Sequence, residues 1–513
     1  MSWQALFSLP RDQRPAHRIH LVGIGGTGLA PIANVLLEMG FQVSGSDQQT
    51  SARTEALAAA SASVHLGHDP AHLLPRPDLV LISSAIAAAN PEVAAARAAG
   101  IPVVKRRELL GPLLAGRRVI AVAGTHGKTT TTGMIAHLLS RGGRPQTAAT
   151  SASSVEPGYI IGSDIPGLGQ SRAGEGDWFV IEADEYDYAF LGLTPEIIVL
   201  TSLEWDHPDC FPTPAAYFAA FERFSRQLRA GGSVVYCRSD ANLRALAAAQ
   251  GGPGWQGYSA HAGADWQARG IEIGPEGVCY TLQGPDGVEQ PVQLAVPGLH
   301  NVLNSAAALI AAGLAGLPLA TAAPLLASFR GAARRFEIKG EAGGVLVIDD
   351  YAHHPTEIRS TLAAARALYP QRQIWAVYEP HTFSRTRALL DQFEGVFAAA
   401  DHLLVTDIYP AREAFDPGIS PAQIVAASRH PQAVASGSLE ETRQHLQGHV
   451  QPGGVVILLS AGPATALAGA LLAAPLSPSL LAALRPLARY GVQENAALAP
   501  HTSFQIGGPA AAL

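Results

Sequence analysis

The segment GTHGKTT at residues 124–130 combines residue types that bind an oligophosphate. It follows the apolar run RVIAVAG, a predicted strand, and opens a segment of helical character. The N–H groups and dipole of a helix N-terminus attract phosphate, Lys128 adds an ammonium group, and the hydroxyl of Thr129 can bind Mg²⁺. The spacing differs from the ordinary P-loop, because the two glycines are three residues apart rather than five. The predicted phosphate site comprises Gly124, Thr125, His126, Gly127, Lys128, Thr129 and Thr130.

Two further strand ends carry residues that can bind a hard cation. Glu182 lies at or just past the end of the run DWFVIEAD, and His207 follows the run EIIVLTS. A carboxylate and an imidazole at neighbouring strand ends can flank bound phosphates. The alternatives are a solvated loop acid for Glu182 and a turn-capping histidine before Pro208 for His207.

A glycine-rich turn, GIGGTG at residues 23–28, follows the first predicted strand and matches the dinucleotide-binding pattern. Asp47, at the end of the next strand, could accept a ribose hydroxyl. The pattern predicts that a diphosphate binds near a helix N-terminus. It is weaker evidence that the ligand carries a nicotinamide group. The alternative is a tight strand-to-helix turn without a ligand.

The segment DDYAHHPTE at residues 349–357 is a dense polar cluster between a predicted strand and a predicted helix. Its two histidines, His353 and His354, raise the question of zinc. Adjacent histidines point in different directions, and no third ligand is spaced to complete a site, so we predict a ribose-binding or substrate-binding edge instead.

A basic segment, HTFSRTR at residues 381–387, follows the strand QIWAVYEP. Its arginines, Arg385 and Arg387, can hold a carboxylate or phosphate through two parallel hydrogen bonds. The alternative is a solvated basic helix start.

Apolar runs of strand length alternate with Ala/Leu-rich helical segments along nearly the whole chain. This alternation predicts an α/β fold with doubly covered parallel sheets, in three consecutive domains. The Gly-rich stretch 251–297 suggests an antiparallel insertion within the second domain. We place the domains at residues 1–116, 117–331 and 332–474, with a linker and tail at 475–513.

The composition favours an ordinary folded protein of the cytoplasm. Hydrophobic residues make up 48% of the 513 residues, and the formal net charge of −7 gives no support for a nucleic-acid partner. Three widely spaced cysteines indicate neither a disulfide framework nor structural zinc, and the N-terminus lacks a signal-peptide pattern. Two long uncharged stretches, 305–329 and 453–484, are broken by Gly and Pro, so we predict no membrane insertion.

The motifs taken together are similar to those of the Mur ligases of peptidoglycan synthesis. The resemblance covers roughly residues 17–470 and rests on GIGGTG, SSAI (83–86), GTHGKTTTT, IEADE (181–185), EWDH (204–207), HNVLN (300–304), RRFE (334–337), DDYAHHPTE and PHTFSRTR. It implies a Rossmann-like N-terminal domain for a UDP-sugar, a central P-loop-type ATPase domain, and a Rossmann-like C-terminal domain. Within the family, the motifs resemble most the branch that joins L-alanine to UDP-N-acetylmuramate.

The resemblance also implies roles for individual residues. In the family the first glycine loop holds UDP rather than NAD, which places Gly25, Gly26, Thr27, Gly28, Ser84 and Arg106 near the sugar nucleotide. ATP would contact the loop at 124–130 together with Asn301, Arg335 and Asp350. Thr129 and Glu182 would hold a first Mg²⁺, and His207 would hold a second. The incoming amino acid would face His353, His381 and Arg385. The residues implied to act in the chemistry are Lys128, His207, His353 and Arg385.

The reaction implied by the resemblance is amide formation through an acyl phosphate, with release of ADP and phosphate, in cell-wall biogenesis and hence in cell shape and division. Hinge closure between the second and third domains would exclude water. Three rivals stay open: a ligase that recycles a preformed tripeptide, an NAD-dependent oxidoreductase built on GIGGTG and Asp47, and a nucleotide-binding protein without catalysis. The tail at 495–513 resembles the opening of UDP-N-acetylenolpyruvylglucosamine reductase, which suggests a ligase–reductase fusion cut short before a flavin site.

Overall fold

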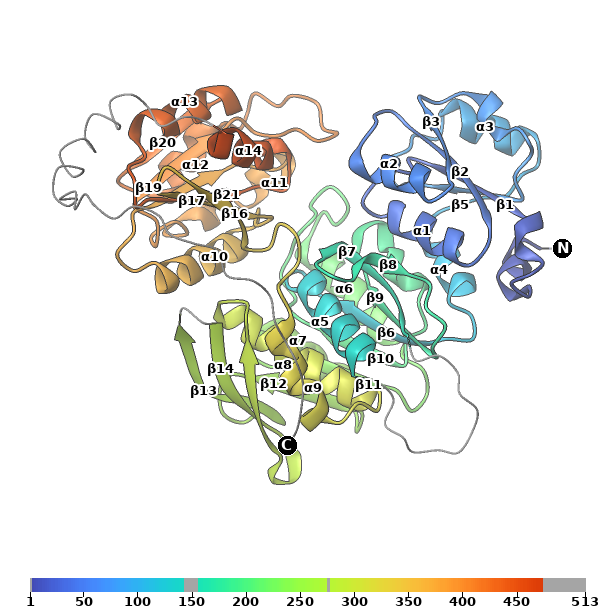
Figure 1. The fold of residues 1–513 in the computed structure, drawn as a ribbon, viewed down its shortest axis with the longest axis horizontal. Helices are drawn as coiled ribbons and strands as arrows, with labels where there is room; N and C mark the ends of the chain where they lie inside the picture. Colours follow the sequence, from blue (N-terminus) through green and yellow to red (C-terminus); the bar gives the residue numbers. More distant parts are fainter. Residues whose placement is uncertain (1, 143–155, 275–276, 474–513) are drawn as a thin grey trace, which may run out of the picture.

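The computed structural model describes residues 2–142, 156–274 and 277–473 (Figure 1). The predicted tail at 475–513 lies outside these residues. The described chain forms three α/β units, each built on its own sheet, in separate lobes coloured blue, cyan to yellow, and orange to red in Figure 1. The predicted α/β fold of three consecutive domains is confirmed. The sheets take their strands from residues 18–104, 118–294 and 337–459, whereas the domain boundaries remain our proposal.

The first unit is a parallel sheet in the order β3-β2-β1-β4-β5. Helix α2 begins at a capping box on Ser51, and α3 begins after Asn90, which caps it directly before a proline. Its elements are η1 Trp3–Ser8, η2 Arg14–Ala16, β1 Arg18–Val22, α1 Ala30–Glu38, β2 Gln42–Asp47, α2 Ala52–Ala59, β3 Ser63–Leu66, η3 Pro70–Leu73, β4 Leu79–Ile82, α3 Pro91–Ala98, β5 Val103–Val104 and α4 Arg106–Leu113.

The central unit is a ten-stranded sheet in the order β15-β14-β13-β12-β11-β10-β6-β9-β7-β8. Its middle strands are parallel, and their inner residues are apolar and buried, as expected for a sheet with helices on both faces. Its elements are β6 Arg118–Ala123, α5 Lys128–Arg141, β7 Gly158–Ile165, β8 Gly169–Arg172, β9 Trp178–Glu182, η4 Tyr186–Gly192, β10 Ile197–Leu200, α6 Pro214–Ser225, β11 Ser233–Cys237, α7 Ala241–Gln250, β12 Trp255–Ser259, β13 Trp266–Gly274, β14 Gly277–Gln283, η5 Pro285–Gly287, β15 Glu289–Leu294, α8 Leu299–Leu314, α9 Leu319–Leu325 and η6 Leu326–Ser328.

The expected antiparallel insertion at 251–297 is only partly correct. Strands β13, β14 and β15 pair antiparallel, but β12 pairs parallel with both β11 and β13. The segment therefore extends the central sheet, because α7 returns the chain so that β12 runs in the direction of β11.

The third unit is a six-stranded sheet in the order β16-β17-β21-β18-β19-β20, with only the β16–β17 pair antiparallel. The described part of the uncharged stretch that begins at residue 453 forms strand β21 and helix α14, separated by a turn. Its elements are β16 Glu337–Ala342, β17 Val345–Asp350, α10 Pro355–Leu368, β18 Ile374–Tyr378, α11 Phe383–Ala388, η7 Leu390–Phe393, β19 His402–Thr406, α12 Pro421–Ser428, β20 Ala433–Gly437, α13 Leu439–His449, β21 Val455–Leu459, η8 Pro463–Thr465 and α14 Ala466–Ala473.

The buried apolar side chains group differently across the two junctions between units. One continuous cluster runs from the first unit into the central one and includes Leu113 of α4 and Phe190 of η4. The third unit instead has its own clusters, around Ile348 and around Val347 on β17. The first two units thus share a core, and the third is joined to them by other contacts. Among the described helices, none has the length and apolar character needed to cross a membrane.

Candidate active site

The loop between β6 and α5 is shaped by two glycines. Gly127 precedes α5 with a φ of 80°, and Gly124 has a φ of 142°. A Cβ at Gly124 would lie 2.1 Å from Thr201 Oγ1, and one at Gly127 would lie 2.6 Å from Asn304 Oδ1. The backbone therefore approaches its neighbours too closely for a side chain, and it leaves the N-terminus of α5 ready for an anion.

Lys128, the first residue of α5, directs its ammonium group to the acidic end of β9. Its Nζ donates to the carbonyls of Gly124 and Thr125 and to Glu185 Oε1, the last at 3.0 Å. Burial alone would lower the pKa of Lys128, but Glu185 and the neighbouring carboxylates raise it. The ammonium group is therefore charged and held at the N-terminus of the helix.

Thr129 and Glu182 provide oxygen atoms at the same point. Thr129 Oγ1 donates to Glu182 Oε1 at 3.0 Å, and the N–H of Gly162 donates to Glu182 Oε2 at 2.6 Å. Burial raises the pKa of Glu182. A hydroxyl and a half-buried carboxylate beside a phosphate loop form an all-oxygen donor set, which suits Mg²⁺.

His207 lies between the central and third units, with its backbone in the left-handed region at a φ of 55°. Its Nε2 is 3.7 Å from Glu185 Oε1, and its Nδ1 is 3.2 Å from an Arg385 guanidinium nitrogen. Arg385 also donates through Nε to Asp206 Oδ1 at 2.8 Å and lies 3.1 Å from His381 Nδ1. Burial opposes the charge on Asp206, yet Arg385 and His207 hold its pKa well below the usual range. Arg385 therefore joins the two units at the site.

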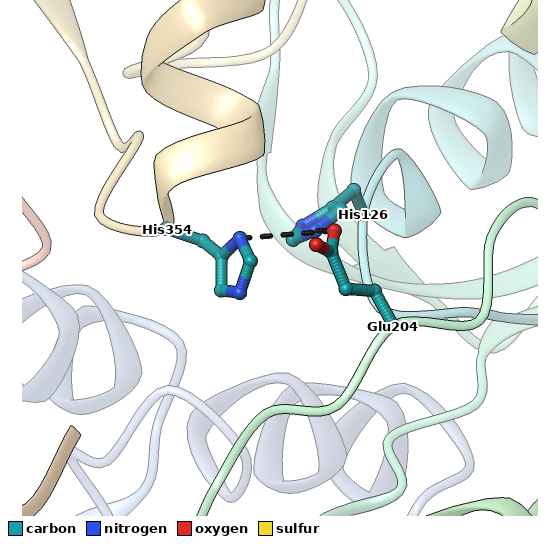
Figure 2. Close-up of side chains that lie close together, drawn as sticks. All are labelled: His126, Glu204 and His354. Carbon is teal, nitrogen blue, oxygen red and sulfur yellow. Dashed lines mark hydrogen bonds and ion pairs between the residues drawn. The ribbon is translucent and has the colours of Figure 1, made fainter. Parts of the chain in front are cut away.

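A second polar contact joins the phosphate loop to the start of α10 (Figure 2). His126 Nε2 donates to Glu204 Oε2 at 3.0 Å, and His126 Nδ1 lies 3.2 Å from Glu357 Oε1. His354 lies beside both residues, with its ring centre 4.8 Å from that of His126 and its Nδ1 3.8 Å from Glu204 Oε2. Burial alone would lower the pKa of His126, but Glu204 and Glu357 raise it to about 9. A protonated imidazole thus bridges carboxylates of two units.

This bridge predicts an alkaline loosening of the contact between the two units. Because the pKa of His126 is raised from 6.5 to about 9, its stabilising effect is complete below pH 6.5 and is lost as the pH rises through 9. The midpoint of thermal unfolding of the nucleotide-free protein should fall over this range. His126→Gln should flatten the fall, and an equally steep fall in that variant would contradict the assignment.

The third unit contributes further predicted residues near the loop. Arg335 NH1 lies 3.6 Å from Glu357 Oε1, and the guanidinium carbon lies 5.0 Å from the centre of the Tyr351 ring. Burial raises the pKa of Asp350 to about 6, and its oxygens accept the N–H groups of Phe336 and Ala352. These contacts fix both side chains at the carboxyl end of β17.

His353 and His381 are half-buried beside Arg385. Burial and the positive charge of Arg385 lower the pKa of His353 to about 4, and burial lowers that of His381 to about 3. The carbonyl of Tyr351 accepts from His353 Nδ1 at 2.9 Å, which leaves a lone pair on His353 Nε2. Both imidazoles are therefore neutral hydrogen-bonding groups at neutral pH.

The first unit holds its predicted residues in a network of its own. Gly25 N donates to Asp47 Oδ2 at 2.9 Å, so this carboxylate already supports the glycine loop. Arg106 donates to Asp184 Oδ2 at 2.7 Å, and Ser84 donates to Asp187 Oδ2 at 2.7 Å. These two contacts connect the first unit to the chain directly after β9.

The predicted residues thus fall into two groups, those that contact the site around Lys128 and Arg385 and those that lie elsewhere. The structure connects Lys128, His207, Arg385 and His381 through shared partners, and it pairs Thr129 with Glu182 directly after Lys128 in the chain. Asn301, on α8, instead bonds to Pro297 O and Asn304. Gly26, Thr27, Gly28 and Thr130 are placed in their loops or helix without a direct contact to this group among the described residues.

Four acids at the site were absent from our list of candidate residues: Glu185, Glu204, Asp206 and Glu357. Each lies within a motif quoted above, directly after a predicted strand or at the start of a helix. Their position at strand or helix ends could have marked them as site residues. Their roles, however, depend on partners that lie far away in the chain and that the sequence does not identify.

Comparison with known proteins supplies the family. The profiles of the "Mur ligase family, catalytic domain", the "Mur ligase middle domain" and the "Mur ligase, glutamate ligase domain" match residues 18–118, 122–312 and 334–462. The chain belongs to the Mur ligase family. It is therefore an ATP-dependent ligase by family, and the oxidoreductase hypothesis is set aside.

Individual Mur ligases match over nearly their whole length. The UDP-N-acetylmuramate–L-alanine ligase of Chloroflexus aggregans is 42% identical, covering 88% of this chain and 97% of that protein. The ligase of the same name from Roseiflexus is 41% identical, over 86% and 96%. The crystal structure of the UDP-N-acetylmuramate–alanine ligase of Thermotoga maritima has a TM-score of 0.72 at 26% identity, over 88% and 98%. A murein peptide ligase from Psychrobacter arcticus has a TM-score of 0.66 at 27% identity, over 89% and 98%.

Proposed function

We propose that this Mur ligase joins the lactyl carboxylate of UDP-N-acetylmuramate to L-alanine, with hydrolysis of ATP to ADP and phosphate. The observation that carries the proposal is a chain of contacts from Lys128 through Glu185 and His207 to Arg385. It connects the phosphate-binding helix with polar side chains of the third unit that can hold an amino acid. The names of relatives at about 40% identity support the choice of substrates.

The chain's own residues would prepare the carboxylate for attack. Bound ATP would supply the phosphoryl group and Mg²⁺ would neutralise its charge, with Thr129 and Glu182 as oxygen ligands of one ion. His207, which lies 3.7 Å from Glu185, would be a ligand of a second ion. Lys128 neutralises phosphate charge from the N-terminus of α5. Transfer of this group gives an acyl phosphate, whose phosphate is a good leaving group.

The third unit would position the amine. Arg385 can hold the carboxylate of the amino acid, and the free Nε2 of His353 can accept a hydrogen bond from its amino group. Attack on the acyl carbon gives a tetrahedral intermediate, which collapses to the amide and releases phosphate. Contact between the two units keeps water from the acyl phosphate.

An assay of phosphate release tests the proposal. UDP-N-acetylmuramate and ATP are supplied with L-alanine, glycine, L-serine or a preformed peptide, and the product is identified by mass. We expect release to be fastest with L-alanine and to require the sugar nucleotide. Release that needs no sugar nucleotide would overturn the proposal.

A murein peptide ligase is the second candidate, because one such structure aligns with a TM-score of 0.66. This function would join a preformed tripeptide in place of L-alanine. Turnover with the tripeptide and none with L-alanine would select it.

A substitution in the first unit tests the sugar-nucleotide site. A Cβ at Gly28 would lie 2.7 Å from Arg106 NH1, the far end of a flexible side chain. Gly28→Ala should therefore leave the fold intact, displace Arg106, and raise KM for the UDP-sugar about 10-fold, or 1.4 kcal/mol. The KM for ATP should stay unchanged. Equal effects on both would show that the glycine loop does not serve the sugar nucleotide.

We also propose that the enzyme works in the cytoplasm with Mg²⁺. Its proposed substrates, ATP and a UDP-sugar, are cytoplasmic metabolites. Cys210, Cys237 and Cys279 are free thiols, which suits a reducing compartment.

A further inference from the structure

Three side chains from two units meet where the phosphate loop touches α10 (Figure 2). They are His126 before α5, Glu204 after β10, and His354 at the N-cap of α10. One ligand atom from each lies within 4.8 Å of the other two. From Glu204 Oε2, the distances are 3.0 Å to His126 Nε2 and 3.8 Å to His354 Nδ1.

Two imidazoles and one carboxylate form a donor set that zinc prefers. Zinc binds nitrogen and oxygen at about 2.0–2.2 Å in a tetrahedron, which places neighbouring ligand atoms about 3.3–3.5 Å apart. The two distances from Glu204 Oε2 bracket that value, and all three ligand atoms lie within 4.8 Å of one another. The fourth position stays open for water.

Neighbouring side chains contact the ligand residues in the way that hydrogen-bonding neighbours contact the ligands of known metal sites. Glu357 Oε1 lies 3.2 Å from His126 Nδ1, the carboxylate–histidine arrangement that orients a ligating imidazole. Thr356 Oγ1 donates to Glu204 Oε1 at 3.0 Å, which leaves Oε2 facing the two histidines. Each partner restrains one ligand on the side away from the cluster.

The two ring nitrogens of His354 differ in their surroundings. It is fully buried, and its Nε2 has no hydrogen-bond partner among the residues that the structure describes. The N–H of Thr356 donates weakly to Nδ1 at 3.3 Å, so Nε2 carries the proton and Nδ1 carries the lone pair. Nδ1 is the nitrogen that faces Glu204, and this is the tautomer that a metal requires.

We propose that His126, Glu204 and His354 form a binding site for a zinc ion that fastens the third unit to the phosphate loop. The ion replaces the proton shared by His126 and Glu204, and it replaces the long Thr356 contact to His354. The site is separate from the oxygen ligands Thr129 and Glu182. Because the ion ties two units that must part for product release, zinc is expected to slow turnover.

Cobalt absorption tests the site directly in the nucleotide-free full chain. Four-coordinate Co²⁺ absorbs strongly in the visible, whereas octahedral Co²⁺ at Thr129 and Glu182 absorbs weakly. We expect one equivalent of strongly absorbing Co²⁺ per chain, displaced by Zn²⁺. Binding should tighten as the pH rises, because His126 must lose its proton. A wild-type chain without this band would overturn the proposal.

Substitutions locate the ion. Glu204→Gln and His354→Ala, one in each unit, should each abolish the band, and Thr356→Val should weaken binding about 10-fold. His449→Ala is the matched control, since His445 and His449 stack at 4.2 Å on α13 and are another histidine pair for cobalt. Loss of the band in His449→Ala, or its survival in both ligand variants, would refute the site. Circular dichroism shows whether each variant is folded. If a ligand variant unfolds, Thr356→Val still tests the site, because Thr356 is a neighbour of the ligand Glu204 and not a ligand itself. The readout needs no ligase activity, so its outcome is independent of the proposed function.

Discussion

Lys128→Ala should lower the turnover number at least about 10³-fold, equivalent to about 4 kcal/mol at the transition state. The buried ammonium group at the start of α5 is the described cation that contacts both the phosphate loop and the acids after β9. Steady-state phosphate release measures the loss. Turnover close to wild type would remove Lys128 from the chemistry and would favour a nucleotide-binding protein without catalysis.

A double variant separates this loss from misfolding. Lys128→Ala leaves Glu185 as a buried carboxylate without its cation, which costs about 3–5 kcal/mol in the free energy of unfolding. Lys128→Ala combined with Glu185→Gln removes that charge. The double variant should recover most of the stability and none of the turnover.

Arg385→Ala should lower turnover about 10²–10³-fold and raise KM for the amino acid. Its guanidinium group contacts Asp206, His207 and His381, so its removal disconnects the third unit from the proposed magnesium ligand. Kinetics with varied L-alanine give both quantities. A change in KM for ATP alone would contradict the proposed contact with the amino acid.

A double-mutant cycle with Asp206→Asn tests whether Arg385 acts through this pair. The two side chains are buried and lie 2.8 Å apart, so a coupling of about 1–3 kcal/mol in the free energy of unfolding is expected. Arg385→Lys keeps the positive charge but loses the planar set of N–H donors of the guanidinium group. It should therefore recover only part of the activity that Arg385→Ala loses. Additive effects would show that the pair does not couple.

Much of the fold could be predicted because the inner strands are buried on both faces. Runs such as Ile197–Leu200 and Val455–Leu459 are continuously apolar and were recognised as strands. Strands at the sheet margins, such as β8 and β20, escaped prediction because they are half-buried and their composition is mixed. The pairing direction of β12 depends on the path through α7, which residue types alone do not specify.

The site was predictable where one motif holds all its parts, as at the start of α5. It was not predictable where partners come from different units. The histidines of DDYAHHPTE lacked a third ligand by spacing, and the structure brings His126 and Glu204 to His354 from the central unit. Likewise, the pairing of Arg385 with Asp206 depends on how the third unit sits against the central one.

The two junctions of this ligase should respond differently to ionic strength. The first and central units share a continuous apolar core in addition to ion pairs such as Arg106–Asp184, whereas the third unit is attached through charged pairs such as Arg385–Asp206 and His126–Glu357. The Debye screening length falls from about 10 Å at 0.1 M salt to about 3 Å at 1 M, and screening weakens the attraction between charges that are still exposed to solvent. Concentrated potassium chloride should therefore slow the docking of the third unit more than it weakens the junction between the other two.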